Sequence, residues 1–233
     1  MPRAPRPLLV IGLDGASHTV LSQLRLRLPH LHTLIEEGAA GIARSTQPPA
    51  TFPAWTSVLT GCPPEVHGVR DLMTRNHAAA NLRPASGTER RVPLIVEELA
   101  RDGYRVACLG VPGLFPPPEA PGLYVSGCDA PGADRAVRSS VFPPSLYREL
   151  EWAGGWRYAI FNEQRVDVEA AVDALLADID AKSRTILRLQ RRCRWDLFIV
   201  HQQASDTACH HLWPGWDRAS PRAMTYPASA ALP

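Results

Sequence analysis

The chain has 233 residues, of which 45% are hydrophobic and 21% charged, the composition of an ordinary globular domain. Its 25 basic and 23 acidic residues give a net charge of +2, which does not support a nucleic-acid or membrane-surface partner. Five widely spaced cysteines without a CxxC pair exclude a zinc ribbon and favour free thiols in a reducing compartment. With no secretory signal and no run of about 18 apolar residues, we expect a cytoplasmic protein.

The predicted elements alternate between short apolar strands and amphipathic helices. The strands are predicted at Leu8–Leu13, Ala39–Ser45, Tyr104–Leu109, Leu123–Ser126 and Trp195–His201. The helices are predicted at Leu21–Glu37 with an interruption at Pro29, at Ala54–Thr60, at Leu94–Ala100 and at Val166–Arg191. This order predicts an α/β fold with a largely parallel sheet flanked by helices.

The remaining segments show weaker patterns. Residues 70–91 are polar and predict a surface excursion, and residues near 135–165 predict an inserted cap beside the substrate pocket. Residues 217–233 are rich in Ala, Pro and Ser and predict an irregular tail. We therefore expect one catalytic domain over residues 8–216.

Asp14 follows the first predicted strand and precedes Gly15. Ligands of open parallel sheets gather at the carboxyl ends of the strands, where a carboxylate can reach a cation. A simple turn is the commoner alternative for an Asp-Gly pair. The chain has no GxGxxG sequence, which argues against a dinucleotide fold.

Thr51 precedes a proline and a helical stretch within Pro48–Gly61. A hydroxyl at a helix N-terminus meets free N–H groups and the positive end of the helix dipole, which favour a phosphoryl group. A helix cap is the alternative for Thr51. Thr56 and Ser57 fall inside the helix, where bonding back to the chain is expected.

Asp206 and His210 follow the last predicted strand and are four residues apart. If a helical turn follows that strand, the carboxylate and the imidazole share one face and form part of a zinc site. His211 is an alternative to His210, and Cys209 is either a soft ligand or a buried thiol. The alternative for Asp206 is a helix cap beside a surface histidine.

Three segments resemble the alkaline phosphatase superfamily, in particular its type I phosphodiesterase/nucleotide pyrophosphatase relatives and their predicted phosphohydrolase or phosphomutase branch. They are the Gly-Leu-Asp-Gly opening within Val10–Gly15, the Thr-x-Pro-Ala-Trp-Thr-Ser and Thr-Gly-x-x-Pro-x-x-His-Gly blocks within Arg44–Gly68, and Trp195–Trp213. The resemblance covers most of Leu8 to about Arg222. It implies a structural role for His67 in the loop near the site.

The resemblance implies a site with two divalent metal ions, zinc or else manganese, acting on a small-molecule phosphate monoester or diester. Asp14 and Thr51 would face one metal, and Asp206 and His210 the other. Thr51 would be the catalytic nucleophile and pass through a phospho-threonine intermediate.

The sequence departs from the family pattern in two ways, which affect the expected substrate and the expected completeness of the fold. Ala54 and Trp55 stand near the place of a phosphate-holding asparagine, which disfavours nucleotide diesters. The later Asp-His-Gly motif and a distal histidine are missing, so we expect a fold incomplete at its C-terminal side, with an exposed strand at Trp195–His201 and poor solubility. The alternative functions are therefore an inactive, truncated family member or a phosphate-ester binding remnant.

Overall fold

The computed structural model describes residues 6–76, 81–132, 135–158, 167–217 and 219–221. Its strands are β1 (Leu8–Leu13), β2 (Met73–Asn76), β3 (Asn81–Pro84), β4 (Val106–Val111), β5 (Leu123–Ser126), β6 (Val141–Phe142) and β7 (Leu197–Gln202). Its α-helices are α1 (His18–Gln23), α2 (Pro29–Glu37), α3 (Thr51–Thr60), α4 (Pro64–His67), α5 (Ile95–Arg101), α6 (Pro144–Trp152), α7 (Val168–Gln190) and α8 (Ala204–Trp216). Single 3-10 turns form at Arg25–Arg27, Gly87–Glu89 and Arg138–Ser140.

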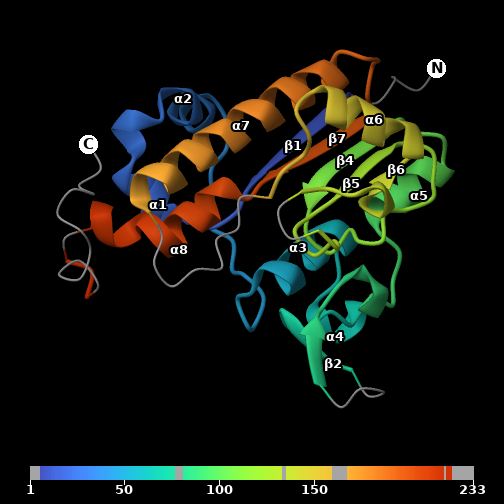
Figure 1. The fold of residues 1–233 in the computed structure, drawn as a ribbon, viewed down its shortest axis with the longest axis horizontal. Helices are drawn as coiled ribbons and strands as arrows, with labels where there is room; N and C mark the ends of the chain where they lie inside the picture. Colours follow the sequence, from blue (N-terminus) through green and yellow to red (C-terminus); the bar gives the residue numbers. More distant parts are fainter. Residues whose placement is uncertain (1–5, 77–80, 133–134, 159–166, 218, 222–233) are drawn as a thin grey trace.

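Five strands form the central sheet in the order β1-β7-β4-β5-β6. The pairs β1–β7, β7–β4 and β4–β5 are parallel, and only β6 runs antiparallel at its edge. Strands β2 and β3 form a separate antiparallel hairpin at one end of the molecule (Figure 1). The predicted α/β fold with a largely parallel sheet is confirmed.

Helices cover both faces of the sheet, and α7 runs lengthwise across one of them (Figure 1). On that face Leu146 and Leu150 of α6 and Leu189 of α7 share a core with alternate sheet residues. These sheet residues are Ala107, Leu109, Val125, Phe198 and Val200. On the other face Leu59 of α3 and Leu94, Val96 and Ala100 at α5 share a core with the intervening sheet residues. These sheet residues are Val106, Cys108, Tyr124, Leu197 and Ile199. The alternation follows from the two-residue period of a strand.

The helices begin and end where the sequence favours it. Asp167 caps α7 by accepting a hydrogen bond from the Ala170 N–H at 3.1 Å. At the end of α3, Gly61 takes a left-handed conformation with φ of +67°, which favours glycine. Pro29 occupies the first turn of α2, so the predicted interruption becomes a helix start.

The strand predicted at Ala39–Ser45 is wrong, because these residues are irregular. Only one of the seven is β-branched, and no neighbouring strand pairs with them in the described parts of the chain. The expectation of an exposed edge at Trp195–His201 is also wrong, since β7 lies between β1 and β4. The edge strands are β1 and β6, and β1 is the edge strand beside β7.

Strand β1 is parallel as predicted but is not buried. Leu8 and Ile11 are each 58% exposed, and Gly12 is its one buried residue. The described residues cover this apolar run only in part: Val10 packs against the core and Trp55 lies over Gly12, while the four leucine and isoleucine side chains are exposed. An apolar sequence indicates that a strand can be buried, but the neighbouring elements decide whether it is.

The segment predicted as a cap contributes β6 and α6 to the main fold. Leu146 and Leu150 of α6 lie in the core, and β6 pairs with β5. Residues 159–165 of this segment lie outside the described residues, as does most of the predicted tail, so the cap and the domain limits stay predictions. Within the described ranges, no helix combines the length and the apolar character needed to cross a bilayer.

The chain's only lysine, Lys182 of α7, is buried in an ion pair with Asp178 at 2.9 Å. Both side chains are 2% exposed. The ammonium also lies 5.7 Å from the ring centre of Trp156 and 5.9 Å from that of Tyr158. Burial lowers the pKa of Lys182 and raises that of Asp178, so the pairing offsets a desolvation cost on both sides.

Candidate active site

The carboxyl ends of β1 and β7 bring two distant parts of the sequence together. Gly12 pairs with His201 and Leu13 with Gln202 in the parallel register. One residue further, the Asp14 N–H donates to the Gln202 carbonyl at 3.1 Å. The Ser205 hydroxyl then donates to the Asp14 carbonyl at 2.7 Å, which fixes the start of α8 against the end of β1.

Asp14 and Asp206 lie close together because Gly15 stands between them. Gly15 has φ of +68°, and a Cβ placed there would lie 2.8 Å from the Cα and 3.1 Å from Oδ1 of Asp206. Burial raises the pKa of Asp206, and the nearby charge of Asp14 raises it further. Two carboxylates held together at a sheet edge are an arrangement that a cation would stabilise.

His210 joins Asp206 on one face of α8, as the spacing predicted. Its Nε2 lies 3.5 Å from Oδ1 of Asp206, and Gln203 donates to the other carboxylate oxygen at 3.0 Å. The His210 side chain is 71% exposed. Burial raises the pKa of the neighbouring Cys209, which disfavours its metal-binding thiolate form and leaves the carboxylate and imidazole as the better ligand pair.

His201 is a site residue that the sequence pattern did not single out. Its Nε2 lies 3.5 Å from Oδ2 of Asp14, and its side chain is 1% exposed. Both atoms are buried without a hydrogen-bond partner in the described residues. Leaving one such group unpaired typically costs about 1–3 kcal/mol of stability. Buried polar atoms without a hydrogen-bond partner are therefore rare, and two of them side by side indicate a functional position.

Thr51 begins α3 and is half-buried. The amides of Thr51 and Phe52 have no intrahelical partner because they lie in the first turn, and Pro53 has no N–H. One turn further along, the Trp55 ring meets His201 edge-on with centroids 4.6 Å apart. Since residues four apart share a helix face, Thr51 starts the face of α3 that points toward this edge.

The structure does not join Thr51 directly to the other candidates. Among the described residues, no hydrogen bond links its hydroxyl to Asp14, Asp206 or His210. Four candidate residues thus form two carboxylate–imidazole pairs, and Thr51 stands on the adjoining helix.

Thr56 and Ser57, the other hydroxyls of this motif, are unsuited to attack a substrate. Thr56 is fully buried, and its Oγ1 packs where a Cβ on Gly113 would stand. Val69 N–H donates to Nδ1 of His67, so the proton of the neutral ring is on Nε2, which donates to Ser57 at 2.9 Å. Burial lowers the pKa of His67, so the ring stays neutral and structural.

The candidate donor atoms form two pairs, and the spacing within each pair suits one divalent cation. Zinc binds carboxylate oxygen and imidazole nitrogen at about 2.0–2.2 Å, so two ligands in tetrahedral geometry are about 3.4 Å apart. Asp14–His201 and Asp206–His210 are each separated by 3.5 Å. Among the described residues, no three side chains of the ligand types converge on one point.

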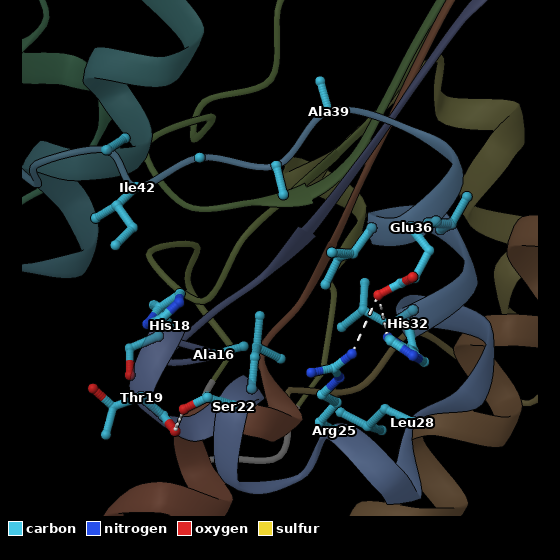
Figure 2. A pocket seen from close by; sticks show the side chains of 18 of the residues that line it. Ala16, His18, Thr19, Ser22, Arg25, Leu28, His32, Glu36, Ala39 and Ile42 are labelled. Atoms are coloured by element: carbon cyan, nitrogen blue, oxygen red, sulfur yellow. Dashed lines mark hydrogen bonds and ion pairs between the residues drawn. The ribbon is translucent and has the colours of Figure 1, made fainter.

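A hollow of about 1170 Å³ lies beside this edge, between α1, α2 and the segment after α2. Figure 2 shows Arg25 and His32 directed at Glu36 on its wall, with Ile42 on the opposite side. In the described residues its lining contains neither Thr51 nor the candidate metal ligands. The hollow is therefore separate from the candidate site.

The fold is similar to that of phosphonoacetate hydrolase from Sinorhizobium meliloti 1021. Its complex with phosphonoformate matches with a TM-score of 0.59 and 19% identity, and its complex with phosphonoacetate with 0.57 and 18%. Each match covers 95% of this chain and 50% of the hydrolase, so the chain spans half the length of these proteins. Among curated proteins, none matches the chain in sequence.

The family comparison covers nearly the whole chain. Residues 8–226 match the model of type I phosphodiesterase / nucleotide pyrophosphatase. The matched range contains Asp14, Thr51, Asp206 and His210. The resemblance to the alkaline phosphatase superfamily is thus confirmed, and the chain belongs to the type I phosphodiesterase/nucleotide pyrophosphatase family.

Proposed function

We propose that the chain provides the phosphoryl-binding part of a metal-dependent phosphohydrolase that acts on a small phosphate monoester or diester. The observation that carries the proposal is the approach of Asp14 and Asp206 across Gly15, at the strand edge where α3 begins with Thr51. The charge of Asp14 acts on the Asp206 carboxyl, and two carboxylates within reach of one another favour cations between or beside them. The family match over residues 8–226 supports the same chemistry.

In this proposal Asp14 and Thr51 face one cation, and Asp206 and His210 hold the other. Divalent cations there would supply positive charge for the attacking and leaving oxygens and ease ionisation of a hydroxyl. Gln203 fixes the Asp206 carboxylate through its 3.0 Å hydrogen bond. Zinc suits the carboxylate–imidazole donors, with manganese as the alternative.

Thr51 acts as the nucleophile. Its Oγ–H proton leaves, a bond forms between Oγ and phosphorus, and the ester P–O bond breaks to release the alcohol, which takes up a proton. Water then attacks phosphorus and the bond between phosphorus and Thr51 Oγ1 breaks, which releases phosphate from a monoester substrate or a phosphate monoester from a diester, and Oγ1 takes up a proton to restore the hydroxyl. The free N–H groups of the first turn of α3 are oriented to hold a phosphoryl oxygen throughout.

The expected substrate is small and carries a phosphoryl group. The similar hydrolase structures hold phosphonoformate and phosphonoacetate, which are small phosphorus acids. Trp55 packs against His201 where the family resemblance would place an amide side chain near phosphate, so the site lacks that donor. This favours compact esters over nucleotide diesters.

Binding without turnover is the second candidate function. The described side chains meet in pairs of ligands, with no group of three. Two protein ligands per cation leave most of the coordination to water or to groups outside the described residues, which predicts weak metal binding. A phosphate-ester binding module would still use the amides at the start of α3.

The test is hydrolysis of p-nitrophenyl phosphate and bis-p-nitrophenyl phosphate with added Zn²⁺ or Mn²⁺. Thr51→Ala should lose activity on the order of a hundredfold or more, because it removes the nucleophile. Ser57→Ala is the matched control and should keep its rate. Equal turnover by Thr51→Ala and wild type would remove Thr51 from the mechanism. Zinc-dependent binding of inorganic phosphate without turnover would favour the binding module.

A further inference from the structure

His201 has a ring nitrogen that the proposed function leaves unused. Its Nε2 and the Oδ2 of Asp14 face each other at 3.5 Å, and both atoms are buried without a hydrogen-bond partner in the described residues. A good N–H···O hydrogen bond is closer to about 2.9 Å. The pair therefore has a separation that leaves room for both atoms to contact a common third partner.

Packing holds the His201 ring in place. The Trp55 ring meets it at 82° with centroids 4.6 Å apart. The indole has this position only because Gly12 has no side chain, since a Cβ there would lie 2.3 Å from the Trp55 ring. Gly12 is the register partner of His201 on β1. The glycine at this position therefore leaves the room in which Trp55 packs against the His201 ring.

The separation agrees with ligation of a cation. Ligands bound at about 2.0–2.2 Å in tetrahedral geometry lie about 3.4 Å apart. The Asp206–His210 pair, on the neighbouring helix, shows the same 3.5 Å spacing between carboxylate oxygen and Nε2. The strand edge thus presents two carboxylate–imidazole pairs, one of them buried and one exposed.

We propose that His201 Nε2 binds a divalent cation together with Asp14, so that each cation of the proposed function is held by one carboxylate and one imidazole. The inference rests on that proposed function. His201 then has its ring proton on Nδ1 and offers the Nε2 lone pair to the metal. This ligand lies on β7, which the sequence alternation marked only as a buried strand.

The experiment is a titration of the protein with ZnCl₂, followed by NMR of ¹⁵N-labelled histidine rings and by competition with a chromophoric chelator. The Nε2 resonance of His201 is expected to shift on zinc binding and is assigned by its absence in His201→Gln. His201→Gln should weaken one zinc site by about tenfold or more. The exposed His30→Gln is the matched control and should bind zinc as wild type does.

His201→Cys separates ligation from packing, because a thiolate restores a metal-binding atom without restoring the ring. Recovery of zinc affinity in His201→Cys supports the proposal. An unmoved Nε2 resonance with full zinc affinity in His201→Gln overturns it, even if His210→Gln weakens zinc and so upholds the proposed function. A His201→Gln variant with a lower zinc-free melting temperature but wild-type affinity assigns His201 to packing alone. Absence of zinc binding in every variant rejects both proposals.

Discussion

The two flanks of the sheet differ in how completely their residues are buried. On one flank, every residue of β4 and β5 is buried, with α5 and α6 packed against their faces. On the other flank, β1 exposes five of its six residues at least in part, and neither α1 nor α2 contains a buried residue. The same kind of apolar sequence thus has two different environments.

This difference locates the stability of the fold and the chemistry of the site in different places. The free energy of burial comes mainly from the flank of β4 and β5, since apolar area removed from water contributes roughly 25 cal/mol per Å². The candidate site lies at the border, where the interior strand β7 meets the exposed strand β1. Its geometry depends on the β1–β7 register, which six residue pairs define.

The largest effect is expected from Leu109→Ala in β4. Leu109 is fully buried in the core, so the substitution removes apolar contacts and leaves a cavity. We expect a loss of about 2–5 kcal/mol in the free energy of unfolding. Leu26→Ala is the matched control on the open flank, 95% exposed, and should change it by less than about 0.5 kcal/mol. Equal shifts in urea midpoints for the two variants would contradict the comparison.

A pH-dependent effect is expected from Asp129→Asn, also on the dense flank. Burial raises the pKa of Asp129 to about 7, partly offset by the Phe115 N–H, which donates to its carboxylate. Because the folded pKa lies above the unfolded value near 4, this group favours folding at low pH, and its contribution is lost as pH rises toward 7.

Asp129→Asn should therefore be more stable than wild type at pH 8, and its advantage should shrink at pH 5. Urea unfolding of both proteins at these two pH values measures the change. A stability difference that stays constant with pH would show that the Asp129 carboxyl has an ordinary pKa in the folded state.

The smallest effect is expected from Ile11→Thr on β1. Ile11 is 58% exposed, so replacing the ethyl group of its side chain by a hydroxyl should lower the free energy of unfolding by under about 0.5 kcal/mol. The same substitution at Ile199, which is 5% exposed on the adjacent β7, should cost about 1–3 kcal/mol. Ile11→Thr should also lower light scattering of concentrated protein, because it reduces the apolar character of an open edge. Equal losses at both positions would mean that β1 is covered in solution.

The sequence predicted the sheet well because its signals are local. Short apolar runs bounded by glycine and proline correspond to β1, with matching bounds, and to β5, also with matching bounds. The Asp206–His210 pair was predictable for the same reason, since a helical turn brings residues four apart together.

The errors and omissions concern contacts between distant parts of the chain. The irregular segment at Ala39–Ser45 is apolar enough for a strand but has no pairing partner. The approach of His201 to Asp14 depends on the register of β1 against β7 and on the space over Gly12 that Trp55 fills. No short stretch of sequence predicts either feature. The segment at Ala39–Ser45 needs a second strand to pair with, and the contact between His201 and Asp14 exists only once β1 and β7 are aligned.

The burial of Lys182 has a practical consequence for labelling. The chain has one lysine, and its ammonium group is 2% exposed beneath Trp156 and Tyr158. Amine-reactive dyes and cross-linkers will therefore find no exposed lysine side chain on the folded chain. Modification of Lys182 requires α7 to leave the sheet. The rate of that modification therefore measures how often this part of the core opens.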